Sequence, residues 1–403
     1  METFIARQPI LNKHNKIFGF ELLFRDSNVN IYNYNDGDEA TLEVLRNIYL
    51  NFGMNKIIGN KKAFVNFTGT LLKSEVFNLI PSETLVIEIL ENIEPEEDII
   101  DACKILKQKG FMIALDDFVF HKKYEKLIEI ADIIKIDFRK TKGIERRNII
   151  RRIKLKNVKF LAEKVETMEE FTEAVSYGYS LFQGYYFSKP VMMSSRKIPE
   201  NKMIYMKLFK ELNGKDLNFD AIENLVKLDI SISYKLLKLI NSASFGLKNN
   251  IKSLRHALNL LGGQEIKIWV YFLIMKNISV SKPDILLQNS LIRAKFCELI
   301  AHKTSLVDIA ENAYLMGMLS LIDIILDNPM DVLLEELMVP AEVGDALLDL
   351  KTNILWKILH IVRLYEVGDW NEVVRYSEEF QLSEEFLSKA YIESCEWVNG
   401  IIS

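Results

Sequence analysis

The first half of the chain alternates short apolar runs with longer amphipathic stretches. The apolar runs are rich in β-branched and aromatic side chains, which favours strands. The stretches between them, such as Glu39–Phe52, Pro95–Lys109 and Met168–Gly178, have the spacing of amphipathic helices. The predicted strands are Ile17–Phe24, Ala63–Phe67, Leu85–Leu90, Met112–Leu115, Ile133–Ile136, Lys159–Ala162 and Leu181–Phe187. So many strand–helix units predict a parallel sheet, most economically closed as a TIM-like (β/α)8 barrel with its chemistry at the carboxyl ends of the strands.

The second half changes to the 3.6-residue period of helices. Val191–Met203 carries two serines, charges and Pro199, and we interpret it as a linker. The helices predicted after it are Met203–Leu212, Phe219–Val226, Ser231–Asn241, Leu254–Leu260, Gln264–Met275, Ile285–Thr304, Ile309–Leu326 and Ala341–Asn353. The fold class is therefore multidomain: an α/β barrel over residues 1–190, a linker over 191–203, and an all-α domain with further C-terminal helices over 204–403.

Composition is that of an ordinary folded protein, with 49% hydrophobic and 27% charged residues among 403. The net charge of −5 gives no general attraction to nucleic acid or anionic lipid. We interpret the basic cluster Arg146, Arg147, Arg151, Arg152 and Lys154 as a solvated helix face, and predict no DNA binding.

Three widely spaced cysteines, Cys103, Cys297 and Cys395, form neither a metal motif nor a disulfide framework, so a cytoplasmic location is expected. The N-terminus does not have the pattern of a secretory signal. The densest late apolar run, Ile268–Met275, is too short to span a bilayer, so we expect no membrane anchor.

Polar and acidic residues lie within or at the end of almost every predicted strand. The first sign is the pair Asp116-Asp117, which follows the apolar run Phe111–Leu115. Alone it would be read as a solvated turn, but the same pattern recurs at Glu21, Asn66, Glu88, Glu91, Lys135, Asp137, Glu163, Glu166 and Gln183. Burying so many charges needs a common reason. Carboxylates with an amide oxygen and a lysine indicate a hard-oxygen site for Mg²⁺ or Mn²⁺, where two ions could clamp a phosphodiester; an acidic pocket of unrelated use is the alternative.

These motifs resemble the EAL family of cyclic di-GMP phosphodiesterases. Arg7-Gln8-Pro9-Ile10 and Gly19-Phe20-Glu21-Leu22-Leu23-Phe24-Arg25 are similar to the signature glutamate strand of the family. The later family motifs are resembled by Asp116-Asp117-Phe118, by Ala162-Glu163-Lys164-Val165-Glu166-Thr167 and by Gln183-Gly184-Tyr185-Tyr186-Phe187-Ser188-Lys189-Pro190. The resemblance covers about residues 4–190 and implies a metal-dependent barrel that acts on cyclic di-GMP.

The resemblance also implies roles at the matching positions. The first metal would be held by Glu21, Asn66, Glu88 and Asp116, and Asp117 would be shared with a second metal. Lys135 would orient the attacking water or the second-metal site, and Glu163 would act as general base or metal-site acid. Glu166 and Gln183 would complete the pocket, Arg25 would hold a phosphate through its planar fork, and Glu91 would anchor the loop after Asp117.

Several positions depart from the family pattern. Leu22 replaces an alanine, Leu90 a threonine, and Lys164 a glycine. The largest departure is Val119–Glu125, because the family usually has a glycine- and serine-rich loop there that couples dimerisation to the second metal. Without glycine at Val119, a turn with positive φ is harder to form.

The helical half resembles the HDOD domain. The resemblance lies in Leu236–Ala243 and Ile251–Gly263, and continues in Arg293–Lys295 and Tyr314–Asp323. HDOD domains are related in fold to HD phosphohydrolases, whose metal site needs an adjacent His-Asp pair. None of the five histidines, His14, His121, His256, His302 and His360, is followed by Asp, so no HD site is expected. We interpret His256 as a packing or surface residue, and Asn241 and Ser242 as helix-capping residues.

Two functions remain open at this level. In the first, the protein is a bacterial cyclic di-GMP signalling protein whose divergent EAL domain either binds cyclic di-GMP or, as a Mg- or Mn-dependent phosphodiesterase, hydrolyses it to the linear dinucleotide. In the second, it is a catalytically inactive EAL–HDOD scaffold that acts through protein–protein interaction. HDOD implies a regulatory or protein-interaction module, and a homodimer is compatible with the sequence. The retained acids favour the enzyme, and the rewritten loop at Val119–Glu125 favours the scaffold.

Overall fold

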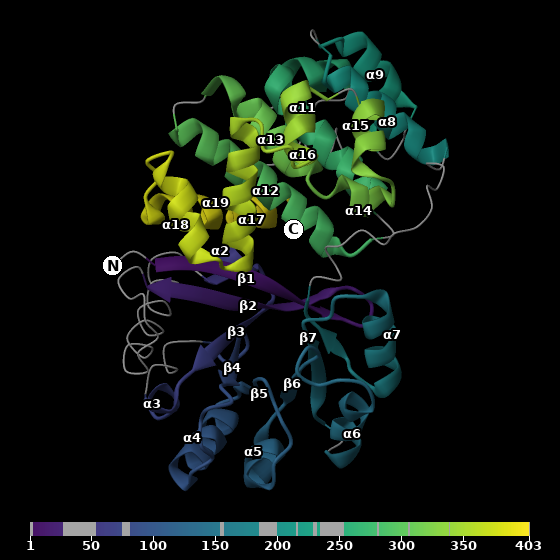
Figure 1. The fold of residues 1–403 in the computed structure, drawn as a ribbon. Coiled ribbons are helices and arrows are strands. Elements are labelled where there is room, and N and C mark those ends of the chain that lie inside the picture. The colour runs from purple at the N-terminus through teal and green to yellow at the C-terminus, as the bar shows by residue number, and fades with distance from the viewer. Residues whose placement is uncertain are drawn as a thin grey trace. The chain divides into compact units, whose positions relative to one another are not determined.

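An eight-stranded closed barrel forms the N-terminal part of the computed structural model (Figure 1). The structure describes residues 3–26, 54–74, 81–153, 157–184, 200–214, 217–228, 232–233, 254–279, 282–304, 307–337 and 339–402. The strands, in barrel order, are β1 (Thr3–Asn12), β2 (Ile17–Asp26), β3 (Lys62–Phe67), β4 (Leu85–Ile89), β5 (Met112–Leu115), β6 (Ile133–Asp137), β7 (Lys159–Glu163) and β8 (Leu181–Phe182). The predicted barrel is confirmed, although β8 ends at Phe182 and residues 185–187 lie outside the described part.

The first strand is the part of the barrel that the sequence pattern did not predict. β1 pairs antiparallel with both β2 and β8, whereas the strands from β2 to β8 pair in parallel. Arg7, Gln8 and Pro9 interrupt its apolar run, and proline is uncommon inside strands. A tight hairpin, closed by a hydrogen bond from Asn12 N to Lys16 O (2.9 Å), leads into β2 without an intervening helix.

One layer of apolar side chains fills the barrel interior. Each strand except β2 contributes one buried residue to this apolar layer, which consists of Ile10, Phe64, Val86, Ala114, Ile133, Leu161 and Leu181. β2 places Gly19 at this level. A Cβ there would lie 2.8 Å from Lys62 O and 2.9 Å from the Phe64 ring, so the close approach of β2 to β3 requires glycine. The packed layer closes the floor beneath the strand ends.

Helices surround the parallel strands, as Figure 1 shows. They are α2 (Met54–Ile58), α3 (Gly69–Leu72), α4 (Glu97–Gln108), α5 (Glu125–Ile130), α6 (Ile144–Arg152) and α7 (Met168–Tyr177), with a 3₁₀ turn, η3, at Lys122–Tyr124. Thr167 caps the start of α7 with its hydroxyl, which accepts from Glu170 N (3.1 Å), and Gly178 in the left-handed region caps its end.

The second half of the chain is helical, as predicted. Its described elements are α8 (Glu200–Leu212), α9 (Phe219–Lys227), α11 (Leu254–Ile278), α12 (Asp284–Lys303), η6 (Val307–Ile309), α13 (Ala310–Leu319), α14 (Ile322–Leu326), α15 (Met330–Leu337), α16 (Ala341–Leu347), α17 (Ile354–Val367), α18 (Trp370–Glu378) and α19 (Glu384–Ile402). Two predicted helices merge into α11, which runs through Gly262 and Gly263, and the helix predicted over Ile309–Leu326 is broken at Ser320. Most of the predicted helix Ser231–Asn241 lies outside the described residues.

The chain divides into two compact units that differ from the predicted sequence domains. One unit comprises residues 1–189, 298–307 and 360–403, and the other comprises 190–297 and 308–359. Within the first unit α19 packs on β1 and α2, and Tyr365 Oη donates to Ile5 O (3.1 Å). The C-terminal helices thus cover the hairpin that has no crossover helix of its own. The predicted limits 1–190, 191–203 and 204–403 stay a prediction.

None of the helices in the described residues is both long and apolar enough to cross a lipid bilayer.

Candidate functional site

Directly above the apolar layer, every strand presents a polar side chain. Because side chains on one face of a strand recur every second residue, the next inward position above Phe64 is Asn66, and above Ile133 it is Lys135. The antiparallel β1 runs the other way, and its register pairs Gln8 with Glu21 and Ile10 with Gly19. We call this set the polar layer; its members are Gln8, Glu21, Asn66, Glu88, Asp116, Lys135, Glu163 and Gln183.

The Lys135 ammonium lies at the centre of the polar layer. Its side chain is fully buried, and four carboxylates surround its Nζ atom: Glu88 Oε1 at 2.7 Å, Asp116 Oδ1 at 2.8 Å, Glu163 Oε1 at 2.9 Å and Glu21 Oε2 at 3.4 Å. Burial opposes the charge of Lys135, but these carboxylates hold its pKa well above the ordinary value. The lysine therefore stays charged and draws the four acids together.

One ammonium cannot neutralise four carboxylates, of which Glu21, Glu88 and Glu163 are buried and Asp116 is partly buried. Burial raises the pKa of Glu88 well above its ordinary value, even though Lys135 acts against the shift. Burial likewise raises the pKa of Glu163 to about 7, with the charges of Asp116 and Glu21 adding to the effect. Protons on these acids relieve the excess negative charge, and a cation would relieve it in the same way.

Several buried oxygens at this level have no hydrogen-bond partner in the described part of the chain. They are Asn66 Oδ1, Glu88 Oε2, Asp117 Oδ1 and Gln183 Oε1. Buried polar atoms without partners are uncommon, and carboxylate and amide oxygens are the donors that Mg²⁺ and Mn²⁺ prefer. The donor set and the excess charge therefore fit a hard divalent cation.

Four carboxylates each direct one oxygen toward Lys135 Nζ. Among the described residues, no group of three or more His, Cys, Asp or Glu side chains is arranged as metal ligands. The ammonium lies between the four carboxylates, where their negative charges are closest together. The residues fit a cation by chemistry, and oxygens that do not face Lys135, such as Glu88 Oε2 and Asn66 Oδ1, are left to bind it.

Gln183 and Gln8 orient Glu21 from the side of β1 and β8. Gln183 Nε2 donates to Glu21 Oε2 (2.8 Å) and to Gln8 Oε1 (3.0 Å). Gln183 is one of the predicted site residues, whereas no role was predicted for Gln8. Its place beside Pro9 in a motif without a predicted strand concealed that it faces inward.

Asp117 lies apart from the Lys135 cluster. Its φ of 43° puts it in the left-handed region, and its Oδ2 lies 2.7 Å from Lys140 Nζ. The hydrogen bond with Asp117 raises the pKa of Lys140. The two adjacent carboxylates thus pair with different lysines, Asp116 with Lys135 and Asp117 with Lys140. Lys140 was not among the predicted site residues.

Two further ion pairs join the loop after β6 to the turn after β7. Lys164 pairs with Asp137, and Arg139 pairs with Glu166. Burial opposes the charge of Asp137, but Lys164 and the backbone N–H groups of Arg139 (2.6 Å) and Lys140 (3.1 Å) hold its pKa below the ordinary value. Lys164, where the family has glycine, has a φ of 53°.

Other predicted site residues have simpler surroundings. Arg25 belongs to β2, but its side chain is not among the described ones. Glu91 has an exposed side chain and contacts the loop after Asp117 through its backbone carbonyl, which accepts from Tyr124 Oη (3.2 Å). That loop is ordered around η3, where His121 Nδ1 accepts from Lys123 N (3.2 Å), and Val119 is 66% exposed.

A cavity of about 380 Å³ opens beside these ion pairs. It is lined mainly by cations and acids of the loop after β6, of α6, of the turn after β7 and of the start of α7: Arg139, Lys142, Arg146, Lys164, Glu166 and Glu170.

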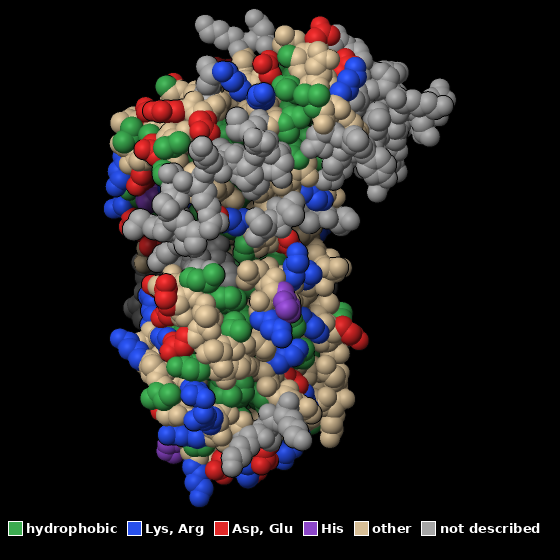
Figure 2. Space-filling view, turned by 90° about the vertical axis from the view of Figure 1, so that its right-hand side faces the viewer, with side chains coloured by type: hydrophobic (Ala, Val, Ile, Leu, Met, Phe, Trp, Pro, Cys, Tyr) green, Lys and Arg blue, Asp and Glu red, His purple; other side chains and the backbone are tan. Residues whose placement is uncertain are grey.

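The prediction that Arg146 belongs to a solvated helix face is wrong. Arg146 is only 6% exposed, whereas Arg147, Arg151 and Arg152 are exposed as predicted and Lys154 lies outside the described residues. On the barrel surface drawn in Figure 2, lysine and arginine side chains are interspersed with acidic and hydrophobic ones. A sequence of five basic residues in nine gave no sign that one of them points inward.

In the helical half, the residues that the sequence analysis singled out are mostly outside the described side chains. This holds for His256, Asn241 and Ser242. His360 packs edge-on against Tyr376, with ring centroids 4.7 Å apart.

In comparisons with known proteins, each half of the chain matches a known domain family. The sequence model of the EAL domain matches residues 58–190, and that of the HDOD domain matches residues 198–351. An uncharacterised protein of Bacillus subtilis, YuxH, is 40% identical over 100% of this chain and 99% of its own length. The cyclic di-GMP phosphodiesterase CdgJ of Vibrio cholerae is 36% identical over 99% of this chain and 93% of its own.

Among solved structures, the similarity covers 47% of this chain. BlrP1 of Klebsiella pneumoniae in complex with calcium and cyclic di-GMP is 21% identical, with 56% of that chain covered and a TM-score of 0.38. An EAL domain protein of Listeria monocytogenes is 23% identical, with 89% of that chain covered and a TM-score of 0.37. On the evidence of its two near-full-length relatives and its two domain matches, the chain belongs to the family of proteins that join an EAL domain to an HDOD domain.

Proposed function

We propose that the barrel is a metal-dependent phosphodiesterase that hydrolyses cyclic di-GMP to the linear dinucleotide, and that the HDOD half regulates it. The observation that carries this proposal is the polar layer, in which four buried or partly buried carboxylates share one ammonium and several oxygens have no partner among the described residues. A relative 36% identical over 99% of the chain is named for this activity.

Mg²⁺ or Mn²⁺ is the proposed cofactor. Glu21, Asn66, Glu88 and Asp116 would hold it, and Asp117 would be shared with a second ion. Bound there, a divalent ion supplies positive charge that polarises a phosphate and acidifies a water molecule. The excess carboxylate charge of the polar layer supports this assignment, since the residues otherwise need protons to remain buried.

Proton transfer is assigned to Glu163. Its pKa of about 7 lets the carboxyl take up or lose a proton near neutral pH, as a general base must. Lys135, 2.9 Å from Glu163 Oε1, keeps its own charge and would orient the attacking water. Gln183 holds the Glu21 carboxylate in place, while Glu166 and Arg25 would contact the nucleotide, with Arg25 on a phosphate.

The remaining parts of the proposal concern location and partners. A cytoplasmic location is supported by the three cysteines, all of which are buried and outside any disulfide. The HDOD half would dock onto a protein partner, and a homodimer is compatible with the proposal. DNA binding and a membrane anchor form no part of it.

A catalytically inactive scaffold is the second candidate. Two ion pairs favour the scaffold: Lys140 pairs with Asp117, and Lys164 pairs with Asp137. Both cations neutralise acids that an active site would offer to an ion. In this candidate the barrel serves protein–protein interaction, and the polar layer only holds the strands together.

Product analysis separates the two candidates. The purified full chain is incubated with cyclic di-GMP and Mg²⁺ or Mn²⁺, and the linear dinucleotide is measured by chromatography. Glu21→Gln should abolish the product, whereas Glu169→Gln, which removes the same charge from an exposed position on α7, should not. Absence of product from the folded wild type with either metal would favour the scaffold.

A further inference from the structure

The buried guanidinium of Arg146 is linked to the turn Glu163–Thr167, which carries two of the predicted site acids, Glu163 and Glu166. Arg146, near the start of α6, is 6% exposed, and its guanidinium stacks on the Phe138 ring with 4.0 Å from Cζ to the ring centroid. Buried arginines are uncommon unless their N–H groups are paired. Because Arg146 is buried, its N–H groups should be paired with hydrogen-bond acceptors.

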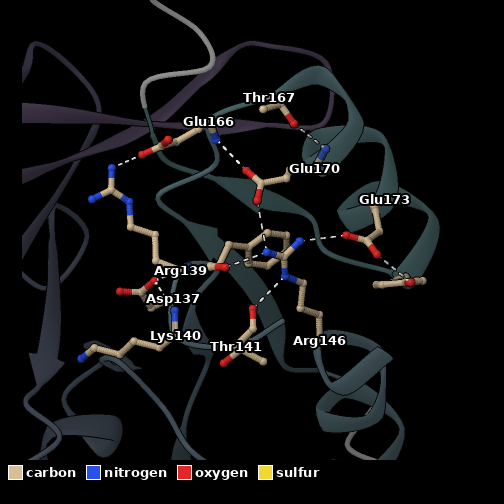
Figure 3. A network of polar contacts seen from close by, with 11 residues as sticks. Asp137, Arg139, Lys140, Thr141, Arg146, Glu166, Thr167, Glu170 and Glu173 are labelled. Carbon is tan, nitrogen blue, oxygen red and sulfur yellow. Dashed lines mark hydrogen bonds and ion pairs between the residues drawn. The ribbon is translucent and has the colours of Figure 1, made fainter. Parts of the chain in front are cut away.

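The partners of Arg146 come from two separate segments (Figure 3). In the loop after β6, Nη2 donates to Phe138 O (2.6 Å) and Nε donates to Thr141 O (2.8 Å). On α7, Nη1 donates to Glu173 Oε2 (2.8 Å) and Nη2 donates to Glu170 Oε1 (3.1 Å). One planar group thus joins two carbonyls of one loop to two carboxylates of the next helix.

Glu170, which binds Arg146 through one carboxylate oxygen, binds the turn after β7 through the other. Its Oε2 accepts from Glu166 N (2.9 Å), while its own N–H donates to Thr167 Oγ1 (3.1 Å). The same turn contains Lys164 at a φ of 53°, a conformation that costs a side-chain-bearing residue about 1 kcal/mol or more. A strained turn keeps its shape only if its surroundings hold it, and the bond from Glu166 N to Glu170 is one such restraint.

We propose that Arg146 is a positioning residue, which sets the distance between the loop after β6 and the turn Glu163–Thr167. Asp137, the last residue of β6, leads into this loop and pairs with Lys164 on the turn. The turn begins at Glu163 and bears Glu166. Arg146 acts on these acids through Glu170 and does not touch the substrate. The effect on catalysis rests on the proposed phosphodiesterase function; the effect on the turn does not.

The key variant is Arg146→Lys. It keeps the positive charge but has no fork, so one ammonium cannot bond two carbonyls and two carboxylates together. Arg151→Lys on the same helix is the matched control, because Arg151 is exposed. Glu170→Gln tests the link between Arg146 and the turn, since it weakens both the bond to Arg146 and the acceptor for Glu166 N–H.

The first readout is hydrogen exchange of the Glu166 amide, measured by mass spectrometry on the full chain. Arg146→Lys and Glu170→Gln should each speed it about tenfold relative to strand β4, and Arg151→Lys should leave it unchanged. Unchanged exchange at Glu166 in a folded Arg146→Lys protein would overturn the proposal. This readout needs no turnover, so it decides the positioning role even if the phosphodiesterase proposal fails.

The second readout is the kinetics of cyclic di-GMP cleavage. A misplaced acid should lower kcat by about 10- to 100-fold with little change in KM, and the double variant Arg146→Lys with Glu170→Gln should be no worse than either single variant. A loss of kcat that only follows the folded fraction, or losses that multiply in the double variant, would mean that Arg146 supports stability and does not position the turn.

Discussion

The raised pKa of Glu163 predicts that the metal-free barrel loses stability as the pH rises through 7. Burial raises this pKa from 4.5 to about 7 in the folded protein. Between these values the folded state holds a proton that the unfolded chain has released. Because the folded pKa of an acid is raised, its contribution is most favourable below 4.5 and falls as the pH increases through about 7.

The magnitude follows from the size of the shift. A difference of about 2.5 pH units at about 1.4 kcal/mol per unit gives about 3 kcal/mol over the full window. Between about pH 5 and about pH 8 the expected loss from this group alone is about 2 to 3 kcal/mol, because the unfolded acid is already partly ionised at the lower pH. The variant Glu163→Gln cannot ionise and lacks this loss.

The assay is urea unfolding of wild type and Glu163→Gln in the presence of a chelator, at both pH values. Hydrogen exchange of barrel peptides should report the transition, because two compact units need not unfold together. Groups remote from Glu163 titrate alike in both proteins, so the pH dependence of the stability difference between the two reports Glu163 together with its coupling to the other acids around Lys135. Glu163→Gln should gain about 2 to 3 kcal/mol relative to wild type at the higher pH. An equal difference at both pH values would refute the reasoning.

Three further predictions concern backbone packing, the C-terminal helices and metal binding. Gly184→Ala should destabilise the barrel by more than about 3 kcal/mol in urea melts, because φ is +147° and a Cβ would lie 2.3 Å from Val165 O. Gly178→Ala, in the left-handed region at φ +107° with open space around it, should cost only about 1 kcal/mol. Comparable losses in the two variants would contradict this argument. Tyr365→Phe should lower the free energy of unfolding by about 1 to 2 kcal/mol, since it leaves the buried Ile5 carbonyl without its donor, and an unchanged melt would show that water replaces the hydroxyl. Mn²⁺ measured by calorimetry should bind more tightly as the pH rises through about 7, with proton release, and affinity independent of pH would contradict the assignment of the polar layer as its site.

Sequence periodicity predicted the barrel and the level of the site well, for a physical reason. In the parallel strands, the site residue lies two positions after a buried apolar residue, as in Val86 and Glu88 or Leu161 and Glu163. Alternation along a strand is local, so it can be read from the chain itself. β1 was missed because Pro9 and its polar neighbours disrupt the same alternation.

The features that could not be predicted depend on contacts between distant segments. Nothing local indicates that Lys135 meets four carboxylates from four other strands, or that Arg146 turns inward while Arg147 points outward. The same holds for α19, which covers β1 across nearly the whole length of the chain. Composition and spacing give the residue types, whereas tertiary packing decides which of them share a site.

The most direct test of the phosphodiesterase claim is a reaction run in ¹⁸O-labelled water. The full chain, cyclic di-GMP and Mn²⁺ are incubated in this solvent, and the dinucleotide is analysed by mass spectrometry. Hydrolysis at the polar layer predicts a linear product with one ¹⁸O in its new terminal phosphate, and none from Glu88→Gln. Intact cyclic dinucleotide after incubation with the folded wild type would contradict the account.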